Sequence, residues 1–243
     1  MEPPVRRGLR PSHVLRTLLA LGVIPTGLAA GLATLFVNRD RRRAVNRTLA
    51  HWGSLGTRAA GIRLEVVGRE HLERPRPAVF LINHQSGVDP ILICALLRRD
   101  FTAVAKREIR RNPLLGPAFA FAGVAFVDRA DRAQAIHALA PAVDALASGL
   151  SLAVAPEGTR SSGAAVGPFK KGAFCIALAA RAPIVPIVIH NARDVLPRRA
   201  WIMRPATVRV AVLPPIPTHA WKLERLDDEI EAVRELYRRT LSA

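Results

Sequence analysis

The stretch PAVFLINHQSGVDPILICALL (residues 77–97) decides the fold. Residues 78–82 are apolar and rich in branched and aromatic side chains, which predicts a short buried strand. Residues 91–99 predict a helix that ends in two arginines, where cations suit the helix dipole. Pro90 fits the first helical turn, and Asp89 is then a natural N-cap. The stretch therefore predicts a strand, a polar turn and a helix.

The polar turn brings a histidine and an aspartate within reach of each other. On one helix, positions five residues apart would point roughly 140° away from each other. With His84 in the turn after the strand and Asp89 at the helix start, the two side chains can converge. A carboxylate that accepts from one imidazole nitrogen fixes the tautomer and leaves the other nitrogen as a base. The alternative is a helix cap beside an incidental loop histidine.

The chain after residue 60 alternates between strand-like and helix-like segments. Strands are predicted at 62–67, 78–82, 101–105, 123–127, 151–155, 184–189 and 207–213. Helices are predicted at 90–99, 113–122, 131–148, 170–181 and 224–241. This alternation predicts one α/β domain over residues 61–243, with a mostly parallel or mixed sheet flanked by helices.

The N-terminal part contains an uncharged segment, residues 17–37, close to the length of about 20 residues that crosses a bilayer. A secretory signal, a spanning helix, and a hairpin or shallow insertion are three competing interpretations. A hairpin would fit the helix breakers Gly22, Pro25, Gly27 and Gly31. A plain buried helix of a soluble protein fits least, because the segment is apolar all round.

Charges favour a segment that enters the membrane and returns, or that lies in one leaflet. Arginines flank residues 17–37 on both sides, and cationic flanks prefer the cytoplasmic side of a membrane. Residues 44–61 are mildly amphipathic and carry Trp52, which suits an interfacial helix. We therefore expect residues 1–60 to form a helical anchor on the cytoplasmic face of the cell membrane, with phospholipid as a partner. A spanning helix remains the alternative.

The composition points to an anionic partner. The formal net charge is +17, and all but four of the 36 basic residues are arginine. A phospholipid surface, a phosphorylated substrate or a nucleic acid would each match this charge. The cations are scattered rather than interleaved with aromatic residues, and no nucleic-acid module is recognisable, so no nucleic-acid partner is expected. Two cysteines without a CxxC or Cys/His cluster predict buried thiols rather than a disulfide or a metal site.

Charged residues follow three more of the predicted strands. Lys106 follows residues 101–105, Arg129 follows 123–127, and Glu157 and Arg160 follow 151–155. Ligands of α/β sheets bind outside the carboxyl ends of the strands, so parallel strands would gather these residues beside His84. One base and three cations make a site for a phosphorylated hydroxyl substrate, since arginine can grip phosphate with two hydrogen bonds. Taken singly, an arginine at a strand end is more often only solvated.

Four motifs of the chain resemble those of the glycerolipid acyltransferases, the family of lysophosphatidic acid acyltransferase (1-acyl-sn-glycerol-3-phosphate acyltransferase). Residues 84–89, preceded by Asn83, resemble its His-x4-Asp motif (HX4D). Residues 123–129 (GVAFVDR), 156–160 (PEGTR) and 185–188 (VPIV) resemble its second, third and fourth motifs. The resemblance covers residues 78–190 well and 60–215 loosely. Ala155 departs from the Phe or Val that is frequent there, and this change removes no reactive group.

The resemblance implies a membrane-bound transferase of phospholipid biosynthesis. It would move a fatty acyl group from acyl-CoA or acyl carrier protein (acyl-ACP) to the free hydroxyl of 1-acyl-glycerol-3-phosphate, lysophosphatidic acid, forming phosphatidic acid. No metal is implied, and no cofactor beyond the acyl donor as co-substrate. The implied site residues are His84 as general base, Asp89 as its orienting group, and Lys106, Arg129 and Arg160 around the acceptor phosphate.

Three residues of the third motif have less definite implied roles. Glu157 would either hydrogen-bond the acceptor hydroxyl or clamp the turn, and Gly158 and Thr159 would shape that turn. Donors for the oxyanion are expected among backbone N–H groups near Gly87 or at residues 89–91.

Two alternative functions stay open at this point. One keeps the acyl transfer but directs it to another lysolipid, an aminolipid or a glycolipid. The other is a non-enzymatic protein that binds anionic membranes or nucleic acid through its charge.

Overall fold

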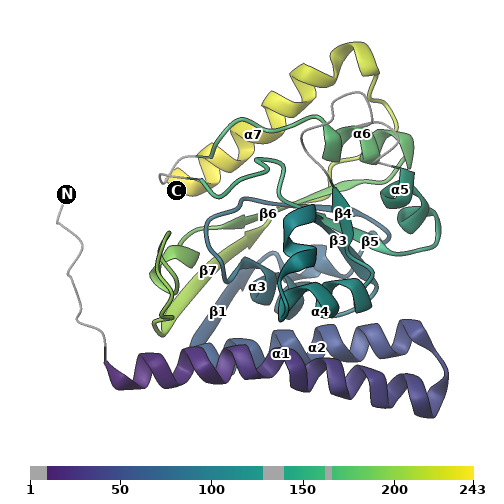
Figure 1. The fold of residues 1–243 in the computed structure, drawn as a ribbon. Coiled ribbons are helices and arrows are strands. Elements are labelled where there is room, and N and C mark those ends of the chain that lie inside the picture. Colours follow the sequence, from purple (N-terminus) through teal and green to yellow (C-terminus); the bar gives the residue numbers. More distant parts are fainter. Residues whose placement is uncertain (1–9, 128–139, 162–165) are drawn as a thin grey trace.

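A mixed α/β sheet forms the centre of the molecule. The computed structural model describes residues 10–127, 140–161 and 166–243. Over these residues, seven strands form one sheet in the order β1-β7-β6-β2-β5-β3-β4 (Figure 1). Their bounds are β1 (Ile62–Val67), β2 (Val79–Ile82), β3 (Phe101–Lys106), β4 (Ala125–Val127), β5 (Ser151–Val154), β6 (Ile184–Ile189) and β7 (Ala206–Val212). Strands β2 to β6 are mutually parallel, while β7 pairs antiparallel with β6 and parallel with β1.

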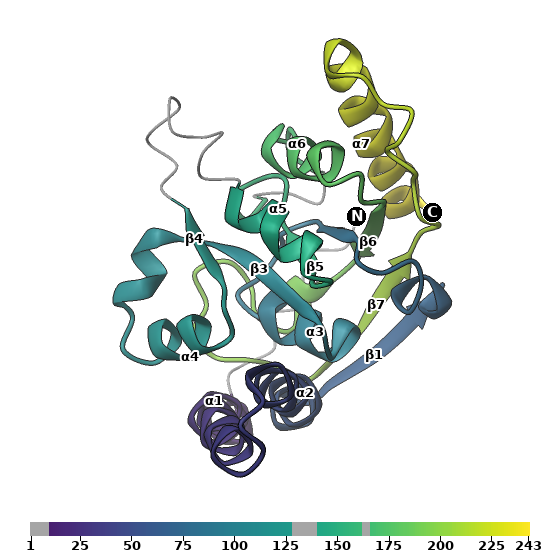
Figure 2. The ribbon, with the colours of Figure 1, turned by 90° about the vertical axis from the view of Figure 1, so that its right-hand side faces the viewer.

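Helices cover both faces of this sheet. The α-helices are α1 (Pro11–Asn38), α2 (Arg41–Ala60), α3 (Asp89–Leu97), α4 (Leu115–Phe121), α5 (Ala140–Ala147), α6 (Gly172–Ala179) and α7 (Leu226–Ser242). Figure 2 shows α5, α6 and α7 on one face, and α3 with the α1–α2 pair on the other. The predicted flanked sheet is thus confirmed. The predicted helix at 131–148 is seen from Ala140, and its earlier part lies outside the described residues.

Strand β2 is apolar throughout because both of its faces are buried. Phe80 and Ile82 pack into the core on the α3 side, and Val79 and Leu81 pack into the core under α6 and α7. All four side chains are at most 1% exposed. A strand covered on both faces reads as a continuous apolar run rather than as an alternation, as the sequence of this segment does.

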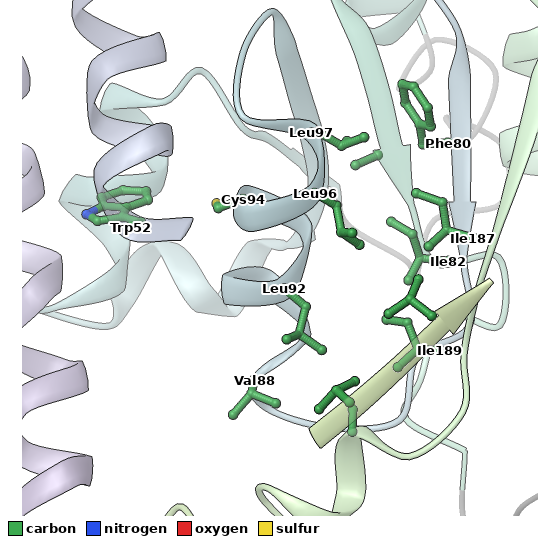
Figure 3. Close-up of a cluster of buried hydrophobic side chains, with 14 of the residues drawn as sticks. Trp52, Phe80, Ile82, Val88, Leu92, Cys94, Leu96, Leu97, Ile187 and Ile189 are labelled. Atoms are coloured by element: carbon green, nitrogen blue, oxygen red, sulfur yellow. The ribbon is translucent and has the colours of Figure 1, made fainter. Parts of the chain in front are cut away.

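Helix α3 is clamped between α2 and the sheet (Figure 3). Leu92 and Leu96 point toward the strands, and Cys94 points toward Trp52 of α2. Gly53 of α2 permits this contact, since a Cβ atom there would lie 2.5 Å from the backbone of Cys94. The N-terminal helices therefore fix the position of the helix that begins at Asp89.

The helix breakers of the N-terminal segment do not break α1, which corrects the hairpin expected within residues 17–37. Pro25 lies inside a continuous 28-residue helix. Gly27 and Gly31 are buried against α2, where a Cβ atom would overlap Trp52 and Thr48 respectively. These small residues serve close helix packing, and the chain reverses after α1, where Asp40 caps α2 by accepting from the Arg43 N–H.

Helix α1 keeps an apolar and uncharged face exposed. Its exposed large side chains are Val14, Leu15, Leu18, Leu19, Leu21, Leu32, Phe36 and Val37. Among the described residues it is the one helix long and apolar enough to cross a membrane by length and composition. Helix α2 ends at Ala60, immediately before β1, but the division of the chain at residue 60 and its anchoring role stay predictions.

Candidate active site

The carboxyl ends of the parallel strands meet at one edge of the sheet, and the candidate residues follow them. His84 comes after β2, and Glu157 and Arg160 come after β5. Lys106 ends β3, where it pairs with Val127, the last residue of β4. Only the backbone position of Lys106 is described, and Arg129 lies outside the described residues.

His84 and Asp89 converge as the sequence analysis expected. His84 Nδ1 lies 2.6 Å from Asp89 Oδ2. Asp89 is buried, and the His84 side chain keeps 30% of its surface exposed. Because the carboxylate can only accept, a neutral His84 ring carries its proton on Nδ1 and keeps the lone pair on Nε2. This geometry gives His84 the tautomer that a general base at Nε2 requires.

Asp89 is not the N-cap that the sequence predicted. Val88 takes the N-cap position, and Asp89 is the first residue of α3. Its Oδ2 turns back to the preceding loop, where it also accepts the backbone N–H groups of Gln85, at 2.8 Å, and Ser86, at 3.0 Å. Three donors on one oxygen hold the carboxylate against the histidine rather than over the helix end.

Glu157 holds the backbone of the histidine. Its Oε1 accepts the His84 N–H at 2.8 Å, and its Oε2 accepts the Gly167 N–H at 3.0 Å. The side chain is buried. Both carboxylate oxygens thus have backbone donors, which favours the clamp over contact with an acceptor hydroxyl among the two roles considered for Glu157.

The rest of the third motif forms the turn that positions the Glu157 carboxylate for these hydrogen bonds. Gly158 has φ +71°, a left-handed conformation that glycine adopts without strain. Thr159 and Arg160 are exposed. Ser161 then donates its backbone N–H to the His84 carbonyl at 2.8 Å. The segment from Glu157 to Ser161 therefore grips both backbone polar groups of His84.

A pocket of about 260 Å³ opens beside this segment. Its walls are Glu157, Thr159, Arg160, Ser161, Gly167, Pro168 and Arg198. The Arg160 guanidinium also lies 3.8 Å from the place that a Cβ atom on Gly87 would take, so it neighbours the HX4D loop. Within the described part of the chain, neither Arg160 nor Arg198 has an acidic partner. The pocket can hold an anion.

The sequence did not predict the structural roles of several residues that shape this site. Arg198 belongs to none of the four motifs, and nothing in the sequence around it signals the pocket. Ser86 donates through Oγ to the Leu196 carbonyl at 2.7 Å. Asn83 exchanges hydrogen bonds of 2.7 and 2.8 Å with the backbone of Ile189, which ties the end of β2 to β6. Its place directly before His84 was the one available signal.

The backbone N–H groups expected for an oxyanion differ in their availability. Those of Asp89 and Ile91 already donate to the carbonyls of Ser86 and Val88. Pro90 has no N–H. The Gly87 N–H donates no hydrogen bond to any described residue, so it is the candidate that remains.

Neither cysteine is suited to carry an acyl group. Burial raises the pKa of Cys94 to about 12, and burial is also the main cause of the raised pKa of the half-buried Cys175. Both thiols are free. Among the described residues, no three His, Cys, Asp or Glu side chains group in a way that could hold a metal ion. The expectation that the protein uses no metal or cofactor stays a prediction.

Comparison with known proteins places this geometry in a family. A family model described as Acyltransferase matches residues 63–190, more than half of the chain. The chain belongs to the acyltransferase family. The match contains His84, Asp89 and all of the PEGTR and VPIV motifs. It also spans all of the strands from β2 to β6, whose carboxyl ends carry the candidate site.

Individual acyltransferases agree with this assignment. The chain is 34% identical over 184 residues to a 1-acyl-sn-glycerol-3-phosphate acyltransferase of Limnanthes alba, covering 75% of this chain and 65% of that one. It is 36% identical over 159 residues to the alpha form of Homo sapiens, covering 65% and 56%. The matched part of the chain thus spans between about half and two thirds of the length of these relatives.

A solved structure resembles nearly the whole chain. The crystal structure of the 1-acyl-sn-glycerophosphate (LPA) acyltransferase PlsC from Thermotoga maritima superposes with a TM-score of 0.78 at 26% identity. The alignment covers 95% of this acyltransferase chain and 96% of the other. The similarity therefore includes the region before residue 63, which the family model leaves out.

Proposed function

We propose that this acyltransferase moves a fatty acyl group from a thioester, acyl-CoA or acyl-ACP, to the free hydroxyl of 1-acyl-glycerol-3-phosphate, forming phosphatidic acid. The observation that carries the proposal is the 2.6 Å contact between His84 Nδ1 and the buried Asp89 carboxylate. It presents an oriented base at the edge of the sheet where a substrate can reach it. The similarity to 1-acyl-sn-glycerol-3-phosphate acyltransferases supports the choice of acceptor.

In the proposed reaction, His84 Nε2 takes the proton of the acceptor hydroxyl while the oxygen attacks the thioester carbonyl carbon. The Gly87 N–H would donate to the oxyanion that develops. When the carbon–sulfur bond breaks, the imidazolium returns the proton to the departing thiolate, so free thiol and acylated lipid leave. Asp89 stabilises the imidazolium between these steps. The attack is direct, because the two cysteines are buried or half-buried with raised pKa values.

The acceptor phosphate would lie in the pocket with Arg160. The free hydroxyl and the phosphate of 1-acyl-glycerol-3-phosphate are on adjacent glycerol carbons, so the phosphate must bind close to the base. Two pocket walls, Glu157 and Ser161, bond directly to the His84 backbone, which gives this closeness. Lys106, at the end of β3, and Arg129 remain further proposed contacts of the phosphate.

We also propose that the exposed face of α1 rests in the cytoplasmic leaflet of the cell membrane. The face combines exposed leucines with Phe36, which is 87% exposed, and carries no charge. An exposed apolar surface of this extent marks a contact with lipid or protein. Lipid suits this chain because the lipid acceptor and the lipid product of the proposed reaction both reside in a bilayer.

The test of the function is thiol release from acyl-CoA or acyl-ACP by detergent-extracted protein with alternative acceptors. We expect release that depends on lysophosphatidate and yields phosphatidate by mass spectrometry. Lysophosphatidylcholine and monoacylglycerol, which lack a phosphate monoester, should be poor acceptors. Equal or better use of either one would overturn the proposed acceptor and leave acyl transfer standing.

A further inference from the structure

We propose that Arg198, from the loop after β6, binds the acceptor phosphate together with Arg160 and makes the site selective for phosphate monoesters. The inference rests on the proposed function and deepens it, because it adds a residue outside the four family motifs. It concerns the recognition of the head group and not the chemistry of transfer.

Arg198 is part of the pocket wall beside the candidate base. It lines the same 260 Å³ pocket as Arg160, from a different element of the chain. The charged walls of that pocket are these two arginines and Glu157. Both oxygens of Glu157 already accept backbone N–H groups, so its carboxylate is occupied within the protein. The charged groups that remain available to a ligand are therefore the two guanidinium groups.

The loop that carries Arg198 is fixed at both ends. On one side, the Leu196 carbonyl accepts the Ser86 hydroxyl at 2.7 Å, which ties the loop to the HX4D turn. On the other side, the Met203 N–H donates to Thr17 Oγ1 of α1 at 2.8 Å. Between these points, the Ala200 N–H donates to the Pro197 carbonyl at 3.0 Å, which closes a turn around Arg198. The backbone thus holds Arg198 at the pocket rather than leaving it on a free loop.

The chemistry of the ligand also fits two guanidinium groups. A phosphate monoester presents three terminal oxygens and up to two negative charges, whereas a phosphodiester presents two oxygens and one charge. One guanidinium binds two oxygens through its paired N–H groups. Beside Arg160, the Arg198 guanidinium in the same pocket would bind the third oxygen and balance the second negative charge. Loss of Arg198 should therefore weaken the binding of phosphate monoesters more than the binding of other acceptors.

The experiment compares two neighbouring arginines. Arg198→Gln and Arg199→Gln each remove one positive charge, but Arg199 does not line the pocket. The two glutamine variants have the same net charge as each other. Their attraction to an anionic membrane or to an anionic donor is therefore weakened equally relative to wild type. Arg198→Lys keeps the charge without the paired N–H groups. Steady-state rates with lysophosphatidate measure KM and kcat for each variant.

We expect Arg198→Gln to raise the KM for lysophosphatidate roughly tenfold with kcat little changed, as loss of a charge-assisted hydrogen bond predicts. Arg199→Gln should match wild type, and Arg198→Lys should lie between the two. Equal KM values for the two glutamine variants would overturn the inference while the proposed function stands.

A binding measurement separates failure of the inference from failure of the proposed function. Calorimetric titration of wild type with the soluble 1-hexanoyl-glycerol-3-phosphate should give heat that 1-hexanoylglycerol does not. Binding that Arg198→Gln weakens supports the inference even if the protein turns over no acceptor. The inference is overturned if wild type binds the two ligands equally well, or if Arg198→Gln binds the phosphorylated ligand as tightly as wild type.

Discussion

Glu157 Oε1 accepts the backbone N–H of His84 at 2.8 Å, although 73 positions separate the two residues. The same carboxylate reaches Gly167 through Oε2. The third motif therefore holds the backbone of the candidate base, while Asp89 orients its imidazole ring. Glu157 of the PEGTR motif thus binds the backbone of the first motif and also lines the pocket.

Substitution of Glu157 should disturb both stability and turnover. In Glu157→Gln the amide nitrogen faces a backbone N–H, so one buried donor loses its acceptor at a cost of about 1–3 kcal/mol. We expect a lower melting temperature in detergent, a lower kcat and an unchanged KM for lysophosphatidate. Glu224→Gln, at an exposed position, is the control and should match wild type. A raised KM at unchanged stability would show instead that Glu157 contacts the acceptor.

Gly53 should tolerate no side chain, because α3 passes directly over it. Gly53→Ala would place a Cβ atom 2.5 Å from the Cys94 backbone and must displace α3 or α2, an overpacking cost of about 1–3 kcal/mol. Gly22→Ala is the matched control, since nothing lies within 4 Å of its Cβ position and alanine favours a helix by about 1 kcal/mol. Thermal unfolding should move in opposite directions for the two variants. Equal shifts would contradict the tight α2–α3 contact.

The thiols should be dispensable for catalysis. Burial raises the pKa of Cys94 to about 12, so the thiol stays protonated at neutral pH and reacts poorly, because the thiolate is the nucleophile. We expect iodoacetamide at neutral pH to leave Cys94 unmodified in the folded protein, as read by peptide mass. The variant with Cys94→Ala and Cys175→Ala should retain turnover. Loss of acyl transfer in that variant, with its fold intact, would point to a covalent acyl-cysteine.

The apolar face of α1 should govern binding to vesicles. Leu18 is 61% exposed on α1, and Leu223, in a short 3₁₀ helix before α7, is 66% exposed. Burying a leucine contributes about 1.5–3 kcal/mol, so Leu18→Glu should weaken binding to anionic phospholipid vesicles by roughly tenfold or more. Leu223→Glu makes the same chemical change off that face and should bind as wild type. Equal flotation of both variants with wild type would contradict the proposed membrane contact.

The local sequence pattern predicted the strands and the contact between His84 and Asp89. Residues 78–82 are read as a buried strand because both faces of β2 are covered, and His84 and Asp89 converge because one turn joins the strand to the helix. The capping position of Asp89 was wrong by one residue. Pro90 did signal the helix start, but the loop N–H groups of Gln85 and Ser86 draw the carboxylate backward, and residue types do not reveal that choice.

Contacts distant in the sequence could not be predicted. The bonds from Glu157 to the His84 N–H and from Ser86 to the Leu196 carbonyl end on backbone atoms, which every residue type offers. The hairpin predicted within residues 17–37 was wrong for a related reason. Gly27 and Gly31 look like flexible points in one segment, but in the structure they are the contact surface for Trp52 and Thr48 of another.

The most direct test of the account is the rate of phosphatidate formation by wild type and by His84→Ala, both shown to be folded by their melting curves. The assay follows acyl transfer to lysophosphatidate at saturating donor. The account predicts that the variant loses turnover by roughly 10²–10⁴-fold, the usual contribution of a general base. A His84→Ala protein that forms phosphatidate at the wild-type rate would contradict it.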